Sequence, residues 1–206
     1  MEIVEIKDYK QNKVKVILDN EIAFVMYKGD LSKYGLKTGD IDEDALKDIF
    51  DNCLYKRALD RALKIITGRD MLKQQLFDKL TDDLYPDEIC MKVVERLSEE
   101  RLLDDERFIR LYIESKSEKK SRNDIFRDLS NKGADMNLVE EIYSTLCESG
   151  DLTDEKDLIE RILIKKKFDP ENADFDTCNK MIRYLLNKGF KFESIRCAME
   201  DFKYNN

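Results

Sequence analysis

The chain has 206 residues, of which 40% are charged and 42% hydrophobic, with a formal net charge of −8 and no histidine. The absence of histidine excludes serine–histidine and cysteine–histidine nucleophiles, an imidazole general base and histidine metal ligands. No segment approaches the roughly 18 apolar residues of a membrane span, and the charged first residues do not resemble a signal peptide, so we expect a soluble, cytoplasmic protein.

The first 41 residues carry a strand pattern. Polar and apolar residues alternate over 2–6 and 13–18, and a third apolar run, 21–26, follows an Asp-Asn turn at 19–20. Alternation with period two and β-branched residues predict strands, and the turn predicts a hairpin. We therefore expect a small antiparallel β-sheet over 1–41, which must pack on a helix because it is too small to be stable alone.

From Asp42 to the end, the apolar residues recur with the helical period. The pattern predicts nine helices, over 42–66, 69–80, from Pro86, from Asp104, 121–133, 137–150, from Thr153 to a break at 169–170, from 176 or 177 to 188, and 192–202. The predicted N-caps are Ser121, Asn137 and Thr153, and the predicted C-terminal glycines are Gly68, Gly133, Gly150 and Gly189. The apolar stripes include Leu72, Leu76 and Leu80 in the second helix and Phe108, Leu111 and Tyr112 in the fourth.

The nine helices form three copies of one unit. Leu80, Leu129 and Leu185 occupy the same position in the middle helix of each copy, at spacings of 49 and 56 residues. These spacings exceed the roughly 34-residue period of common two-helix repeats. We therefore expect a mainly α fold, an elongated curved array of three tandem three-helix repeats over 42–103, 104–150 and 151–206, preceded by the small sheet.

Charge is unevenly distributed along the chain. Residues 81–105 hold nine acidic and three basic side chains, whereas 107–132 hold eight basic and four acidic ones. The acidic stretch can meet a basic partner or simply favour solubility. The basic residues can contact an acidic surface or phosphate, or they can form an ordinary solvated helix face; 165–167 can also simply stabilise a helix C-terminus. The candidate partner-binding residues are Lys116, Lys119, Lys120, Arg122, Arg127, Lys132, Arg161, Lys165, Lys166, Lys167 and Arg183.

The five cysteines are scattered, without a Cys-x-x-Cys pair, at 53, 90, 147, 178 and 197. This spacing predicts reduced thiols in the apolar core and no zinc site. Phosphate-binding glycine loops and a nucleophile elbow are also absent from the sequence. We therefore expect no catalytic residue, no cofactor and no metal.

The sequence resembles the RecX family, the regulators of the RecA recombinase, over essentially its whole length. Residues 103–108 read Leu-Asp-Asp-Glu-Arg-Phe, like the family's junction between the first two repeats. Residues 129–133 (Leu-Ser-Asn-Lys-Gly) and 185–190 (Leu-Leu-Asn-Lys-Gly-Phe) are similar to its leucine–lysine–glycine turns. The lead over 33–39 is similar to the N-terminal extension of Gram-positive members. The sequence departs from the family at 120–122, where Lys-Ser-Arg replaces Lys-Gly-Pro.

The resemblance implies a monomer that lies in the groove of the RecA–DNA filament. It implies inhibition of the ATPase, recombinase and co-protease activities of RecA, in DNA repair and the SOS response, with DNA contact at most weak. A generic helical-repeat adaptor for another protein partner is the alternative, because a repeat architecture alone does not determine the partner.

Overall fold

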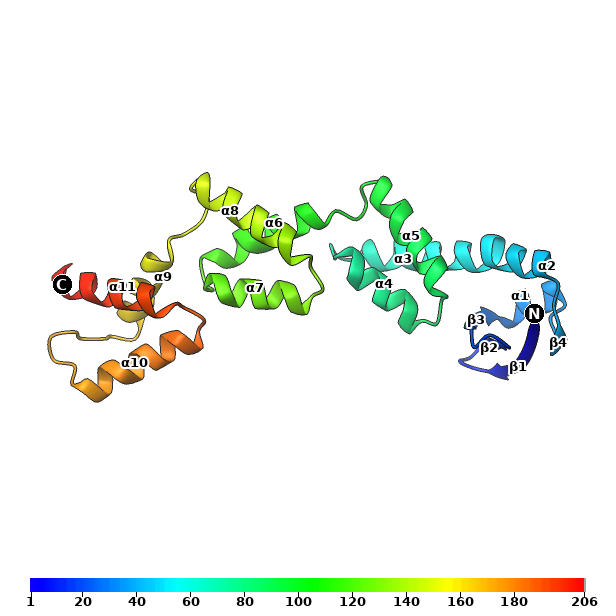
Figure 1. The fold of residues 1–206 in the computed structure, drawn as a ribbon, viewed down its shortest axis with the longest axis horizontal. Coiled ribbons are helices and arrows are strands. Elements are labelled where there is room, and N and C mark those ends of the chain that lie inside the picture. The colour runs from blue at the N-terminus through cyan, green and yellow to red at the C-terminus, as the bar shows by residue number, and fades with distance from the viewer. Residues whose placement is uncertain (206) are drawn as a thin grey trace. The chain divides into compact units, whose positions relative to one another are not determined.

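The computed structural model describes residues 1–205, the last two by their backbone alone, as a small N-terminal β-sheet followed by helices (Figure 1). The chain divides into two compact units, 1–105 and 106–206. The mainly α fold with an N-terminal antiparallel sheet is thereby confirmed, and the grouping of the helices into three repeats stays a prediction.

The sheet has four strands, β1 (Glu2–Asp8), β2 (Lys13–Leu18), β3 (Ala23–Tyr27) and β4 (Gly39–Asp40), in the antiparallel order β3-β2-β1-β4. The three predicted strands are confirmed. The sequence prediction missed β4 and the helix α1 (Lys28–Tyr34). Two residues are too few to show alternation, and the seven residues of α1 place only Leu31 and Tyr34 against the core, which is too few to show a helical period.

The sheet packs on the first helices, as expected. Val16 lies opposite Phe24 across the β2–β3 pair, and both side chains are fully buried. The Phe24 ring meets the Phe50 ring edge to face, with centroids 5.5 Å apart. On the far edge of β3, the Val25 N–H donates to the Leu84 carbonyl at 3.3 Å. Sheet and helices therefore share one hydrophobic core.

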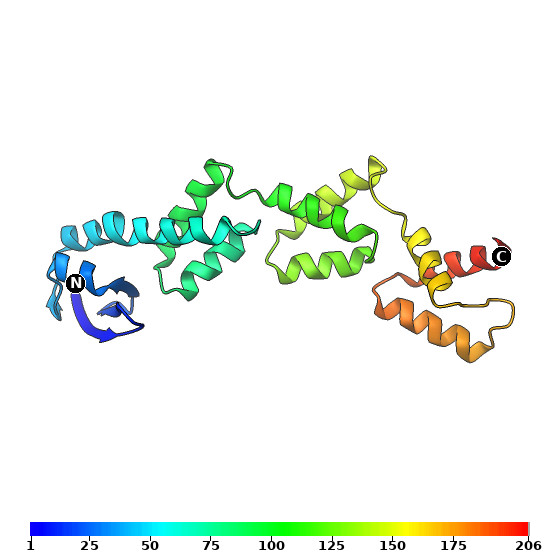
Figure 2. The same cartoon turned by 180° about the vertical axis from the view of Figure 1, so that it is seen from behind.

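The first unit contains α2 (Glu43–Asp48), the π-helix η1 (Ile49–Leu54), α3 (Tyr55–Ile66), α4 (Lys73–Asp82) and α5 (Asp87–Glu99). Residues 43–66 are helical throughout, close to the predicted span, but the π segment was not predicted. The α4 helix begins later than the predicted Arg69, because Leu72 is extended and its N–H donates to the Gln75 side chain. Pro86 directly precedes α5. Figure 2 shows α4 and α5 beside α3 from the other side.

The remaining helices are α6 (Asp105–Ser117), α7 (Arg122–Asn131), α8 (Met136–Glu148), α9 (Glu155–Lys165), α10 (Phe175–Asn187) and α11 (Phe192–Asn205). Ser121 is the predicted cap of α7 and accepts from the Asp124 N–H. The predicted caps of α8 and α9 were wrong by two residues and one residue, because Asp135 and Asp154 accept the free N–H groups instead. The α10 helix begins at Phe175, one or two residues before the predicted start, and Asp174 caps it.

One predicted apolar stripe is also corrected. In α6 the fully buried residues are Ile109 and Ile113, whereas Leu111 is 49% exposed and Phe108 and Tyr112 are half-buried. Two apolar stripes compete on this helix, and only packing selects between them. The cysteine prediction is corrected too: all five thiols are free, but Cys147 and Cys197 are exposed.

Six of the described helices end in the same way. The residue after each C-cap is left-handed, and the next N–H bonds back to a leucine carbonyl, as in Tyr85 N–H to Leu80 O at 3.1 Å. These left-handed residues are Leu84, Arg101, Gly133, Gly150, Lys167 and Gly189. Three of the four predicted glycine stops are confirmed; Gly68 follows α3 but is not left-handed. No described helix is long and apolar enough to cross a membrane.

Candidate protein-binding surface

Two lysine side chains of the second unit lie against the ring of Tyr112 on α6. The Lys116 and Lys132 ammonium groups each lie 5.7 Å from the Tyr112 ring centroid. Phe108, one helical turn earlier, stacks on the same ring with centroids 6.2 Å apart. A half-exposed ring attracts cations to its face, so these two lysines from α6 and the end of α7 are held at one place.

Lys120 belongs to the same cluster but is paired internally. Its ammonium contacts the Asp128 carboxylate, which also accepts from the Tyr112 hydroxyl at 2.8 Å. The hydrogen bond from Lys120 lowers the pKa of Asp128. Burial, followed by the bond to Asp128, raises the pKa of Tyr112 to about 12. The charge of Lys120 is thus largely neutralised within the protein.

Arg122 is half-buried, with 30% of its side chain exposed. Its guanidinium lies 4.6 Å from the Phe126 centroid and 5.2 Å from the Tyr143 centroid, and it pairs with Glu140. Its Nε is buried without a hydrogen-bond partner among the described atoms. Its backbone N–H donates to the Glu155 carboxylate at 2.8 Å. These contacts fasten α7 to α8 and α9, which indicates a structural role for Arg122.

The other predicted cations of this region face solvent. Lys119 is exposed in the link between α6 and α7. The Arg127 side chain is 64% exposed and touches Asp124 at 2.5 Å. Both can reach a partner without breaking a packed contact.

A second tyrosine–lysine cluster lies at the end of α10. Lys166 lies 4.7 Å and Lys188 lies 5.6 Å from the Tyr184 centroid. Lys188 is absent from the predicted set, although the repeated Asn-Lys-Gly at 131–133 and 187–189 pairs it with Lys132 and could have identified it. The other predicted cations of this part are exposed: Arg161, Lys165, Lys167 and Arg183.

The start of α7 contacts the turn after α10, which brings the Tyr184 cluster close to the α6–α7 link. The Ser121 hydroxyl donates to the Lys188 carbonyl, and the Asn123 amide donates to the Gly189 carbonyl, both at 2.8 Å. The turn that carries Lys188 is therefore held beside residues 121–123. This arrangement offers positive charge and aromatic edges to an acidic protein surface or to phosphate. Among the described residues, no group of His, Cys, Asp or Glu is placed to hold a metal ion.

No family model matches the sequence. Curated relatives are the regulatory protein RecX of Clostridium tetani, 28% identical over 98% of this chain and 94% of the relative, and that of Bacillus velezensis, 27% identical over 99% and 78%.

Solved structures agree in fold. A crystal structure of regulatory protein RecX superposes with a TM-score of 0.63 at 18% identity, covering 97% of this chain and 98% of the other. RecX from Lactobacillus salivarius superposes with a TM-score of 0.60 at 20% identity, covering 73% and 97%.

Proposed function

Because this chain belongs to the RecX family of regulatory proteins, we propose that it binds the RecA–DNA filament and lowers the ATPase, recombinase and co-protease activities of RecA. The observation that carries the proposal is similarity to regulatory proteins along nearly the whole chain. The absence of histidine from the sequence is in keeping with a role that needs no proton-transfer chemistry. We further propose that it acts in the cytoplasm as a monomer.

The partner-binding surface that we propose is the exposed part of the predicted cation set, on the second unit. Lys119, Arg127 and Arg161 project into solvent, and the tyrosine-held lysines Lys116 and Lys166 extend the positive surface. Such a surface complements carboxylates of a protein filament and tolerates DNA phosphate nearby. Lys120 and Arg122 support this surface from within, because their charges are paired internally.

The test is the DNA-dependent ATPase of RecA from the same organism. We expect inhibition at substoichiometric to stoichiometric ratios of this protein. An unchanged ATPase rate with the protein in excess over RecA would refute the proposal.

Charge reversal locates the surface. We expect Lys119→Glu combined with Arg161→Glu to weaken filament binding roughly tenfold while leaving the melting temperature nearly unchanged, since exposed cations contribute little to stability. Lys56→Glu combined with Lys64→Glu reverses two exposed lysines of the first unit; this is the matched control and should bind like the unsubstituted protein. Equal loss in the control would indicate a non-specific charge effect.

A further inference from the structure

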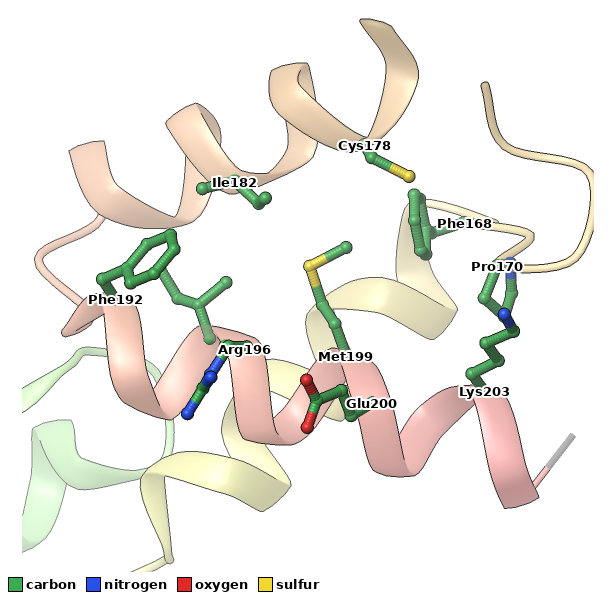
Figure 3. Close-up of a pocket in the computed structure, with 10 residues that line it drawn as sticks. Phe168, Pro170, Cys178, Ile182, Phe192, Arg196, Met199, Glu200 and Lys203 are labelled. Atoms are coloured by element: carbon green, nitrogen blue, oxygen red, sulfur yellow. The ribbon is translucent and has the colours of Figure 1, made fainter. Parts of the chain in front are cut away.

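An apolar pocket opens between α10, α11 and the loop that joins α9 to α10 (Figure 3). It has a volume of about 260 Å³. Its walls are Phe168, Pro170, Cys178, Ile182, Phe192, Ile195, Arg196, Met199, Glu200 and Lys203. The Phe192 side chain at its edge is 55% exposed. An accessible apolar pocket bordered by a few charged groups is typical of a binding site for an apolar side chain.

The corresponding groove between α7 and α8 is filled. A shift of 56 residues, which superposes Leu129 on Leu185, also pairs Arg122 with Cys178 and Tyr143 with Met199. In the α7–α8 groove the Arg122 guanidinium lies against the Phe126 and Tyr143 rings. The α10–α11 groove has smaller or unbranched side chains at these positions, so the space that Arg122 occupies in one groove is open in the other.

The charge beside the groove is also reversed. Glu140, which pairs with Arg122, corresponds to Arg196. Around the pocket, Arg196 and Lys203 provide two positive charges and Glu200 provides one negative charge. At the position where Arg122 meets the Glu140 carboxylate, a cation in this pocket would meet the Arg196 cation, and the three charged residues together leave a net charge of +1. An apolar side chain with a carboxylate next to it fits both the walls and the border.

We propose that this pocket binds one aromatic or long aliphatic side chain from an acidic segment of a partner protein. The apolar side chain takes the place that Arg122 fills between α7 and α8, and the flanking carboxylates meet Arg196 and Lys203. The inference rests on the proposed function only in taking that partner to be a protein of the RecA filament.

Methyl NMR of the full chain with a synthetic peptide tests the pocket directly. The probe is an acetylated heptapeptide with a central phenylalanine between glutamates; the matched peptides replace the glutamates with lysine or the phenylalanine with serine. We expect the acidic phenylalanine peptide to shift the Met199 ε-methyl and Ile182 δ1-methyl signals, the lysine peptide to bind about tenfold more weakly, and the serine peptide to have no effect. Unmoved methyl signals at millimolar peptide, or equal binding of the lysine peptide, would overturn the inference.

Two substitutions give the pocket the residues found in the groove between α7 and α8. Met199→Tyr fills the pocket and Arg196→Glu reverses its border, and each introduces the residue found at the same position in α8. We expect Arg196→Glu, followed through the Met199 and Ile182 methyls, to weaken peptide binding about tenfold, and Met199→Tyr, followed through Ile182, to abolish it. Lys180→Glu, the same charge change at an exposed site on α10 outside the pocket, should bind normally.

The ATPase assay separates this inference from the proposed function. Peptide binding without ATPase inhibition would leave the pocket standing and remove the filament role. ATPase inhibition that Met199→Tyr and Arg196→Glu leave unchanged, with no peptide binding, would retain the filament role and remove the pocket.

Discussion

Three left-handed residues at helix ends are not glycine. Leu84, Arg101 and Lys167 have φ angles of 62°, 57° and 52°. A side chain in this conformation costs about 1–2 kcal/mol. The backbone bond that closes each helix end offsets that cost, as in Leu102 N–H to Leu97 O at 2.9 Å. Glycine at these positions would keep the bond without the strain.

We therefore expect Arg101→Gly to raise the free energy of unfolding by about 1 kcal/mol, measured by urea denaturation. Glu99→Gly is the control two residues earlier, at the last helical position of α5, where glycine should lower the free energy of unfolding by about 1 kcal/mol. Destabilisation by both substitutions would contradict the left-handed conformation of Arg101.

Because the pKa of Asp128 is lowered in the folded protein, the stability of the protein depends on pH. Lys120 and Tyr112 both bond to the Asp128 carboxylate and hold its pKa below its ordinary value. A carboxyl whose folded pKa is depressed stabilises the protein above its unfolded pKa of about 3.9, and this contribution disappears as the pH falls through the folded pKa. We expect Asp128→Asn to lower the free energy of unfolding by about 1–2 kcal/mol at pH 7.

The difference in free energy of unfolding between the unsubstituted protein and the Asp128→Asn variant should shrink as the pH falls below about 4. Urea denaturation at pH 7 and pH 3 measures it. A difference that stays constant over this range would show that the carboxylate charge does not contribute to stability.

At the scale of elements, the turn between α10 and α11 is closely packed against the start of α7. A Cβ atom built on Gly189, whose φ is 82°, would lie 2.6 Å from the Ser121 hydroxyl and 2.9 Å from an Asp124 carboxylate oxygen. Gly150 has a similar φ of 75°, but a Cβ there would meet nothing within 4 Å. A comparison of substitutions at Gly150 and Gly189 therefore separates the cost of backbone strain from the cost of a clash between helices.

We expect Gly150→Ala to cost about 1 kcal/mol through its conformation alone, and Gly189→Ala to cost about 1–3 kcal/mol more through overpacking. Thermal or urea unfolding of the two variants gives the comparison. Equal losses would mean that the α10–α11 turn does not press on α7.

The N-terminal sheet makes a comparable contact in the first unit. The Val25 N–H bonds to the carbonyl of Leu84, and the Asn123 side chain bonds to the carbonyl of Gly189; both acceptors are left-handed residues that follow a helix C-cap. The strands themselves were predicted from alternation. Their contact with Leu84 was not, because it joins residues 59 positions apart through backbone atoms that leave no trace in composition.

At the scale of the whole molecule, acidity is concentrated in the first unit. Residues 1–105 carry 18 basic and 24 acidic side chains, a net charge of −6, whereas 106–206 carry 19 and 21, a net charge of −2. Long-range repulsion from phosphate therefore acts mainly through the first unit, and the second unit with its exposed cations is better suited to approach a negatively charged surface.

We expect weak binding to protein-free DNA, with an affinity that falls as salt is raised, because few phosphates can be neutralised. Fluorescence anisotropy with labelled DNA at two salt concentrations measures this. Tight binding at physiological salt would contradict the expectation and make DNA a direct partner.

The sequence by itself determined the helical pattern, three N-terminal strands, the helix ends at glycine and the resemblance to RecX, because these depend on periodicity and short motifs within a few residues. Only the tertiary structure decided which cations are available. Arg122 and Lys119 are both basic residues of one segment, yet Arg122 is held by Glu140 and Glu155 whereas Lys119 is exposed. Ion pairs, stacking and open grooves depend on residues brought together from distant positions, which local patterns do not encode.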